Sequence, residues 1–291
     1  MSNIKVVGIG EALWDVFPEG KKIGGAPANF AFHAAQFGLE GIAVSAIGKD
    51  ELGDEIVETF GQSGLNYLLE RVDYPTGTVQ VELDEAGVPS YIIKEGVAWD
   101  NIPFTPQLEA LAKSTDAVCF GSLAQRSEVS RATINAFLDA MPEGSLKIFD
   151  INLRQHFYTE EIVRTSMQKA DILKINDEEI IKVADMLLCS LSSMEDICSF
   201  LLREFNLKMV ILTRGAVGSN VFTKEEMSWL ETPKVDVVST VGAGDSFTGA
   251  FIASILKGED IRTAHHRAVD VSAFVCTQTG AMPQLPEELL R

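Results

Sequence analysis

The chain has 291 residues, enough for one large α/β domain or two smaller ones. Its formal net charge of −18 argues against nucleic acid and anionic membrane surfaces as partners, because both require a basic footprint. The apolar runs are too short to span a membrane, and the opening MSNIKVVGIG does not resemble an export signal. We therefore expect a cytoplasmic protein that contacts neither nucleic acid nor membrane.

The first apolar run, residues 5–10, predicts a strand, and a glycine-rich segment follows it. Gly24 and Gly25 precede an expected helix whose first turns carry Asn29. Asp15 and Asn29 offer polar ends suited to vicinal hydroxyls, and the glycines leave room for a ring. Because Asp and Asn are also common at turns and helix starts, these residues alone indicate a sugar site only weakly.

Further short runs of the same kind follow, separated by segments of helix length. Such nearly continuous apolar runs are typical of strands covered on both faces. Strands alternating with helices predict a doubly wound, mostly parallel sheet within a single α/β domain over residues 1–291. The further predicted strands are residues 42–48, 116–123, 146–152, 171–176 and 208–213.

Two segments break this alternation and predict a small inserted β lid, formed by about residues 12–23 and 76–102. In the second segment Val79 and Val81 alternate with polar residues, and DEAG at 84–87 is expected to turn the chain into another strand. Such a lid would exclude water from a site at the carboxyl edge of the sheet. Its open hairpin edge invites pairing, so a homodimer through the lid is a further expectation.

The sharpest chemical signal lies in residues 237–258, where a strand is expected to run into Gly242-Ala243-Gly244-Asp245 and an amphipathic helix to follow. The first N–H groups of a helix have no intrahelical acceptor and, with the helix dipole, form an anion site. Asp245 beside that site could accept a proton from an attacking hydroxyl. The alternative is a tight turn in which Asp245 only interacts favourably with the helix dipole.

Together, the two motifs resemble the signatures of the ribokinase/PfkB carbohydrate kinase family, and the resemblance extends over the whole chain. It implies a ribokinase-like fold, with ATP phosphorylating a small sugar. Asp245 would be the general base, and the amides of Gly242, Ala243 and Gly244 the anion hole. The first signature is read in Gly24, Gly25, Pro27, Asn29, Ala31, Gly38 and Gly48, and the second in residues 239–245 with Gly249 and Ala250.

The same resemblance gives roles to residues near the middle of the chain. Asn176 and Glu179 match the family's NxxE element and would organise Mg²⁺ and its waters near the phosphates. Residues 150–154 match the DxNxR element of fructokinases and 2-keto-3-deoxygluconate kinases. Strand alternation would place Asp150, Asn152 and Arg154 on one side. Arg154 would contact the substrate or the γ-phosphate.

The remaining implied contacts divide between sugar and nucleotide. The residues expected at the sugar are Asp15, Gly24, Gly25, Asn29, Asp150 and Asn152, and those expected at ATP are Thr213, Gly215, Gly218, Thr277 and Gly280. One position departs from the family pattern. Many relatives place Asp where this chain has Ser239, and that Asp helps to bind a monovalent cation. A serine hydroxyl attracts a cation less strongly than a carboxylate does, which argues against K⁺ activation.

Fructose, converted to fructose 6-phosphate, is the expected substrate, because GEALWD, DxNxR and the AWD at 98–100 resemble fructokinases. The alternatives are 2-keto-3-deoxygluconate or another sugar, and a sugar or nucleotide sensor that has kept the fold without catalysis. A dinucleotide oxidoreductase is disfavoured because the first strand leads into GIGEAL and not GxGxxG. The chain also lacks GxxxxGK[ST], which excludes a P-loop kinase.

Overall fold

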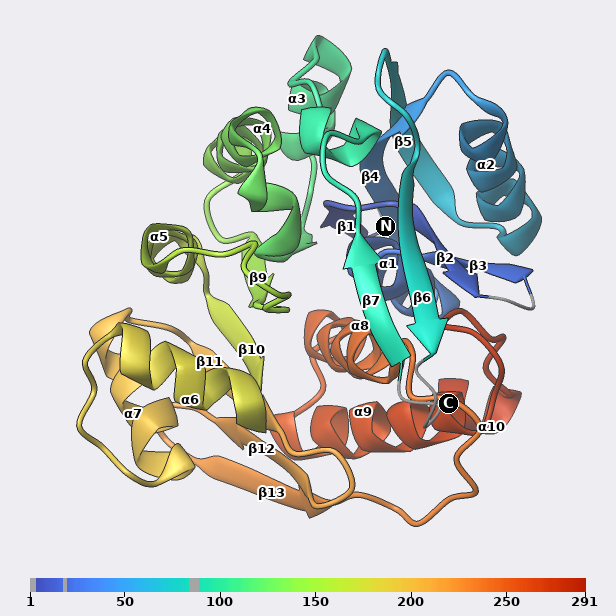
Figure 1. Cartoon of the computed structure of the whole chain (residues 1–291). Helices are drawn as coiled ribbons and strands as arrows, with labels where there is room; N and C mark the ends of the chain where they lie inside the picture. The colour runs from blue at the N-terminus through green and yellow to red at the C-terminus, as the bar shows by residue number, and fades with distance from the viewer. Residues whose placement is uncertain (1–3, 18–19, 84–88) are drawn as a thin grey trace.

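The computed structural model describes residues 4–17, 20–83 and 89–291. Within them, nine strands form one sheet in the order β13-β12-β11-β10-β9-β8-β1-β4-β5 (Figure 1). All neighbours from β11 to β5 run parallel, and the two pairs that involve β12 are antiparallel. The strands are β1 (Lys5–Ile9), β4 (Glu40–Gly48), β5 (Asn66–Val72), β8 (Ala117–Phe120), β9 (Leu146–Asp150), β10 (Ile172–Asn176), β11 (Met209–Thr213), β12 (Gly218–Phe222) and β13 (Met227–Glu231).

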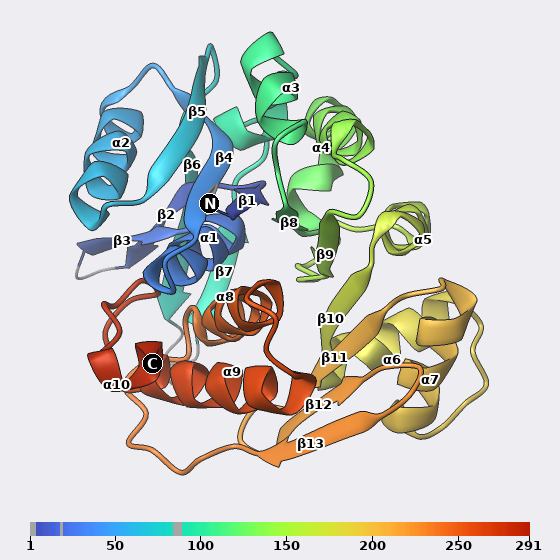
Figure 2. The ribbon, with the colours of Figure 1, turned by 180° about the vertical axis from the view of Figure 1, so that it is seen from behind.

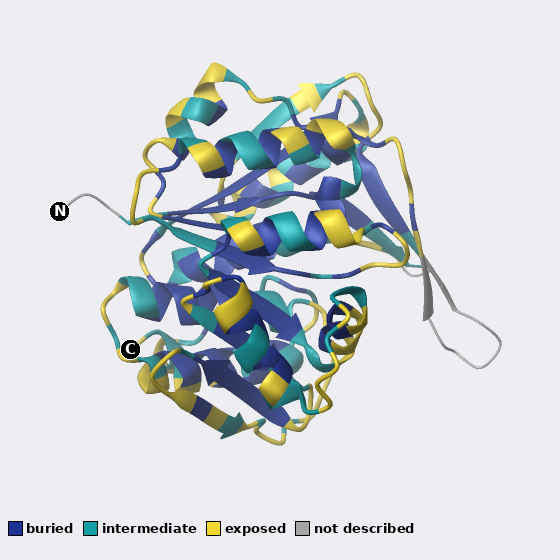
Figure 3. Ribbon diagram, turned by 90° about the vertical axis from the view of Figure 1, so that its left-hand side faces the viewer, coloured by how far each residue is buried: buried dark blue, intermediate teal, exposed yellow. Residues whose placement is uncertain are grey.

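The six predicted strands of the α/β domain all lie in the parallel part of this sheet, so the predicted fold class is confirmed. Their continuous apolar character has a direct cause, since helices cover both faces. Successive residues of β1 enter opposite cores: Val6 packs in one, and Val7 and Ile9 in the other. Figure 3 shows buried residues between the helical layers and exposed residues on their outer surfaces.

One helical layer comprises α1 (Ala26–Gln36), α2 (Glu51–Ser63), α8 (Ala243–Leu256), α9 (Ile261–Cys276) and α10 (Glu287–Leu290). The other comprises α3 (Pro106–Ala112), α4 (Glu128–Ala140), α5 (Glu160–Lys169), α6 (Asp177–Met186) and α7 (Met194–Glu204). Figure 2 shows α1, α8 and α9 from the side opposite to Figure 1. In the described part of the chain, no helix combines the length and apolar character needed to cross a membrane.

A second, four-stranded sheet has the order β3-β2-β6-β7. Its central strands β2 and β6 pair in parallel, and the two outer pairs are antiparallel. Its strands are β2 (Leu13–Phe17), β3 (Gly20–Gly24), β6 (Gly77–Leu83) and β7 (Pro89–Ile93). The DEAG turn predicted at 84–87 lies outside the described residues. The end of the predicted segment forms a buried 3-10 helix, η1 (Ala98–Asn101).

Two predictions about residues 237–258 were wrong. The backbone is irregular from residue 232 to residue 240, where a strand was expected. Val237 and Val238 are each 60% exposed, and the amides of Val238 and Ser239 both donate to the carbonyl oxygen of Cys276. This segment therefore bonds to the end of α9 and not to a neighbouring strand. In addition, α8 is not amphipathic: residues 246–254 are all buried, because the helix packs between α1 and α9.

Candidate active site

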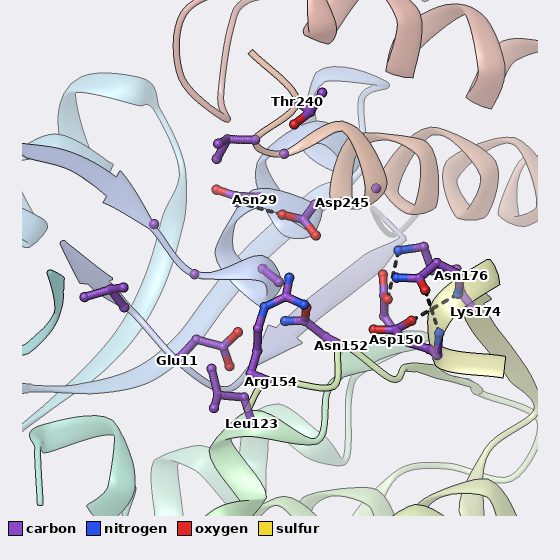
Figure 4. Close-up of a pocket in the computed structure, with 18 of the residues that line it drawn as sticks. Glu11, Asn29, Leu123, Asp150, Asn152, Arg154, Lys174, Asn176, Thr240 and Asp245 are labelled. Carbon is purple, nitrogen blue, oxygen red and sulfur yellow. Dashed lines mark hydrogen bonds and ion pairs between the residues drawn. The ribbon is translucent and has the colours of Figure 1, made fainter. Parts of the chain in front are cut away.

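A cleft of about 900 Å³ opens at the carboxyl edge of the main sheet, next to the small sheet. Parallel strands all end at this edge, so the loops that follow β1, β9, β10 and β11 meet there. Figure 4 shows polar side chains from these loops facing the start of α8. The predicted site residues that line the cleft are Asp15, Gly24, Gly25, Asn29, Asp150, Asn152, Arg154, Asn176, Glu179, Thr213, Gly215, Gly242, Gly244 and Asp245.

Four other predicted residues lie outside that lining, namely Ala243, Gly218, Thr277 and Gly280. Gly218 begins β12, where a Cβ atom would collide with the Trp229 ring. Thr277 caps the C-terminal end of α9, and its hydroxyl donates to the Phe274 carbonyl at 2.7 Å. Gly218 and Thr277 therefore take part in the packing of β12 and the capping of α9.

Asp245 lies in the first turn of α8, directly after a tight bend. The bend is made by Gly242, whose φ of 81° lies in the left-handed region that favours glycine. The side-chain amide of Asn29 donates a hydrogen bond to Oδ2 of Asp245 at 2.7 Å. Burial, followed by the charge of Asp150, raises the pKa of Asp245 to about 6. The carboxylate is therefore available as a proton acceptor near neutral pH.

The start of α8 also supplies backbone donors next to this carboxylate. The Ala243 amide, one of the three donors expected in the anion hole, instead donates to the Thr240 carbonyl oxygen at 3.3 Å, which leaves Gly244 of that set and the next amide, that of Asp245. The amides of Gly244 and Asp245 belong to the first turn, where an α-helix offers no intrahelical acceptor. With the positive end of the helix dipole, this first turn favours an anionic group in the cleft.

Lys174 is a buried cation at the centre of the cleft, and the sequence analysis did not identify it. Its Nζ lies 3.0 Å from Oδ1 of Asp150, whose Oδ2 accepts from the Thr248 hydroxyl at 3.1 Å. Burial alone would lower the pKa of Lys174, but the charges of Asp150, Glu179 and Asp245 outweigh it and raise the pKa. A lysine within the apolar run DILKIN was the available signal, since buried lysines are almost always paired.

Asp150, Asn152 and Arg154 all line the cleft, but strand alternation does not bring them together. Strand β9 ends at Asp150, and Asn152 has a left-handed φ of 46°. The DxNxR element is therefore the end of a strand followed by a loop. Figure 4 shows Arg154 reaching into the space between Glu11 and Asp245. Its charge acts to lower the pKa of both carboxyl groups.

Asn176 and Glu179 form a capping box at the start of α6. Oδ1 of Asn176 accepts from the amides of Glu178 and Glu179, and Oε2 of Glu179 accepts from the Asn176 amide at 3.0 Å. Oε1 of Glu179 accepts from the Leu153 amide at 2.9 Å. Burial raises the pKa of Glu179, and Lys174 opposes that effect. Within the described residues, no group of three or more His, Cys, Asp or Glu side chains has metal-binding geometry.

Two further carboxyl groups lie on the side of the cleft next to the small sheet. Burial raises the pKa of Asp15, on β2, to about 6 and that of Glu11, in the loop after β1, to about 7. Glu11 is only 4% exposed, and the sequence analysis did not select it. The signal was present in its position, because Glu11 follows a strand whose carboxyl end lies at the edge where ligands bind in such folds.

Comparison with known proteins places this cleft in a family context. The pfkB family carbohydrate kinase profile matches residues 10–288. An ATP-dependent 6-phosphofructokinase of Thermoanaerobacterium thermosaccharolyticum is 27% identical, covering 92% of this chain and 83% of the relative.

Two solved structures share the fold. Fructokinase from Vibrio cholerae O395, bound to fructose, ADP and a calcium ion, is 25% identical with a TM-score of 0.84, covering 99% of this chain and 98% of that chain. Fructokinase from Xylella fastidiosa with bound ATP is 21% identical with a TM-score of 0.85, covering 100% of this chain and 98% of that chain.

Proposed function

The chain belongs to the pfkB family of carbohydrate kinases, and we propose that it transfers the γ-phosphoryl group of ATP to a hydroxyl of a neutral sugar, with fructose as the first candidate. The observation that carries this proposal is the placement of Asp245. Its carboxylate is fixed by Asn29 and lies in the first turn of α8, beside amides that favour an anion. A hydroxyl in the cleft would therefore be close to both a proton acceptor and an anion site.

In the proposed reaction, the oxygen of the sugar hydroxyl bonds to the γ-phosphorus atom, and Asp245 accepts the proton of that hydroxyl. The bond to the leaving oxygen of ADP breaks, and the amides of Gly244 and Asp245 stabilise the charge on the phosphoryl oxygens. Arg154, which reaches the same space, is suited to these oxygens through its planar donors. Gly242 gives the backbone its bend, and Ala281 packs against the side where a Cβ on this glycine would lie.

The nucleotide is proposed to lie along Thr213 and Gly215, on the far side of Asp245 from the small sheet, with Thr277 and Gly280 nearer the adenine. Mg²⁺ typically uses one or two carboxylates together with substrate phosphates, and when bound it neutralises phosphate charge. The residues present fit a Mg²⁺ ion that they would contact through its bound water molecules. Both oxygens of Glu179 accept backbone amides, so Glu179 and Asn176 would hold its waters and not replace them.

The charges around the sugar side favour a neutral substrate over a sugar acid such as 2-keto-3-deoxygluconate. Glu11, Asp15 and Asp245 are carboxyl groups that line this side, and Lys174 is already paired with Asp150. Among the described residues that line this side, Arg154 is then the cation left to offset them. A carboxylate on the substrate would meet more negative than positive charge. This charge distribution supports a neutral sugar, the class to which fructose belongs.

A panel of sugars assayed with ATP and Mg²⁺ tests the proposal. We expect turnover of fructose, and formation of fructose 6-phosphate is identified by its coupled oxidation after isomerisation. Turnover of 2-keto-3-deoxygluconate without turnover of any neutral sugar would overturn the choice of substrate class. A protein that binds sugar or ATP but transfers no phosphoryl group would instead be the sensor alternative.

Three further properties are part of the proposal. Activity is expected without K⁺, because Ser239 supplies one hydroxyl, which accepts from the Val241 amide at 3.2 Å. Replacement of K⁺ by tetramethylammonium in the assay tests this.

A homodimer would form through the small sheet, whose β7 carries the half-exposed Ile92, and sedimentation at micromolar concentration tests it. The protein is expected in the cytoplasm, which fractionation would check.

A further inference from the structure

The segment of residues 277–286, between α9 and α10, has no helix or strand, yet part of it is buried against the start of α8. Ala281 is 2% exposed. A Cβ atom added to Gly242 would lie 2.7 Å from both the Cα and the Cβ of Ala281, so the two residues pack against each other. Gly242 makes the bend that precedes the first-turn amides of α8. Because a packed interior leaves little free space, the position of Ala281 limits where that bend can lie.

A buried histidine of α1 holds this segment in place. His33 is fully buried, and its Nε2 lies 2.8 Å from the carbonyl oxygen of Ala281. A carbonyl oxygen can only accept, so Nε2 carries the proton and donates. Burial lowers the pKa of His33 to about 4, which keeps the ring neutral near pH 7. The lone pair of the neutral ring is then on Nδ1, which lies 3.4 Å from Nε2 of Gln36.

Gln36, one turn further along α1, binds the same segment closer to its end. Its Oε1 accepts from the Leu285 amide at 2.7 Å, and its Nε2 is directed to the Pro283 carbonyl oxygen at 3.3 Å. Figure 2 shows the segment that joins α9 to α10 passing beside α1. An irregular segment lacks the repeated backbone bonds of helices and strands, so bonds of this kind determine where it lies.

The same histidine also lies where α1 packs against α8. A Cβ atom added to Gly249, in the second turn of α8, would lie 2.8 Å from the Cβ of His33. The two helices therefore approach closely at this pair. His33 thus contacts the body of α8 directly, and through the Ala281 carbonyl it holds the segment that packs against the bend before α8.

A second buried histidine provides a comparison within the same chain. His265, on α9, is also fully buried, and its ring nitrogens lie 2.8 Å from the Ser219 hydroxyl and 2.9 Å from the Ser228 hydroxyl. Neither serine lines the cleft. The hydrogen bonds of His265 therefore join α9 to β12 and β13, whereas the ring of His33 is connected to the anion site through one intervening residue.

We propose that His33 is a positioning residue for phosphoryl transfer, which holds the bend at Gly242, and with it the first-turn amides of α8, through the Ala281 carbonyl. His33 does not line the cleft, so its effect on the reaction is indirect. Donors that stabilise a transition state must be held in place before the reaction, because they then need no reorganisation. This inference rests on the proposed kinase function and adds to it a residue outside the cleft.

The first test compares His33→Leu with His33→Gln. Leucine fills much of the space but removes the donor, which leaves the Ala281 carbonyl oxygen buried without a partner. Glutamine can bring its amide nitrogen near the position of Nε2 and still donate. We expect kcat per folded molecule to fall about 10- to 100-fold in His33→Leu, as for other small displacements of a catalytic site. His33→Gln should recover most of that loss, and KM for the sugar should be unchanged in both variants.

A binding measurement separates positioning from general damage. ADP with aluminium fluoride and fructose, or whichever sugar the wild-type protein phosphorylates, imitates the transferring phosphoryl group. In His33→Leu the affinity for this combination should fall by the same factor as kcat, while the affinities for ADP alone and for the sugar alone should be unchanged. The stoichiometry of the same calorimetric titrations gives the fraction of folded protein.

His265→Leu is the matched control for the loss of a buried histidine. It should lower the melting temperature, because two buried hydroxyl groups lose a partner, and it should leave kcat per folded molecule unchanged. If His33→Leu does not fold, Gln36→Leu decides. This substitution removes the bond to the Leu285 amide at a partly exposed position and should lower kcat without changing KM for the sugar.

Three results would overturn the inference. One is an unchanged kcat in folded His33→Leu. Another is an equal loss of affinity for ADP, for the sugar and for the aluminium fluoride combination, which would assign His33 a structural role only. The third is an equal loss of kcat in His265→Leu. In all three cases the wild-type protein still phosphorylates the sugar, so the proposed function stands. A wild-type protein that transfers no phosphoryl group from ATP to any sugar overturns both proposals.

Discussion

Asn29 and Asp245 are 216 positions apart in the chain and are joined by a 2.7 Å hydrogen bond across the cleft. Asn29 belongs to the glycine-rich segment near the N-terminus, and Asp245 to the start of α8 near the C-terminus. The bond places the segment expected to bind the sugar against the proposed base. The bond also orients Oδ2 of Asp245, because Asn29, whose side-chain amide donates it, is itself held within α1.

Replacement of Asp245 by Asn is expected to reduce kcat by about 10²- to 10⁴-fold, the usual contribution of a general base. Sugar binding, measured by calorimetry, should change little, because the side chain keeps its size. Nearly full activity of the Asp245→Asn variant would show that another group accepts the proton.

The pH dependence of kcat/KM, which reports the pKa values of the free enzyme, should show an acid limb. Only the ionised carboxylate accepts a proton, and the pKa of Asp245 is raised to about 6. Activity should therefore be flat above that pH and fall about tenfold for each pH unit below it. Stopped assays over a pH series measure the limb. A profile that stays level well below pH 6 would contradict the assignment of Asp245.

Gly244→Ala is expected to reduce kcat, because a Cβ at this position would lie 2.7 Å from the Lys174 ammonium. The lysine or the start of α8 must move, and both line the phosphate site. Gly61→Ala is the matched control, since Gly61 lies in α2 with open space around it. That variant should keep full activity and gain about 0.5–1 kcal/mol in stability. Equal activity of the two variants would argue against a role for this contact.

Lys174→Met should destabilise the protein by about 3–5 kcal/mol, because it leaves Asp150 buried without its cation. Adding Asp150→Asn should recover part of that loss, since the amide carries no charge to desolvate. Denaturant unfolding of the single and double variants gives the coupling energy. Strictly additive effects would mean that the pair does not interact energetically.

Glu11→Gln should stabilise the empty protein at alkaline pH. The pKa of Glu11 rises from 4.5 to about 7 on folding, so the folded state holds an extra proton between these values. Stability contributed by that proton is present below pH 4.5 and is lost as pH rises through 7. The variant should therefore gain up to about 3 kcal/mol at pH 8 and much less near pH 4.5. A constant difference across this range would contradict the buried carboxyl.

The sheet could be predicted because its physical signal is local. Strands covered on both faces must be apolar throughout, and the six predicted runs show this directly in the sequence. The error at residues 237–241 has the same origin. Val237, Val238 and Val241 form an apolar stretch, yet each is exposed, because this segment turns along the end of α9. The apolar character of a run does not by itself reveal whether that segment pairs with a neighbouring strand.

The site was only partly accessible from sequence for a related reason. Gly242, Gly244 and Asp245 are adjacent, so their geometry follows from one turn. The segments around Lys174 and Glu11 indicate that each is a charged residue in a buried position, but they do not reveal the distant charged groups that surround it.

A single residue, Gly25, connects the small sheet to the proposed base. Strand β3 ends at Gly24 and α1 begins at Ala26, with Asn29 in the first turn of that helix. A shift of the small sheet relative to α1 would therefore reach Asn29, and through it Asp245, by way of one residue. We expect any closure of this sheet over a bound sugar to reposition the Asp245 carboxylate in the same movement, which would limit hydrolysis of ATP while the cleft is empty.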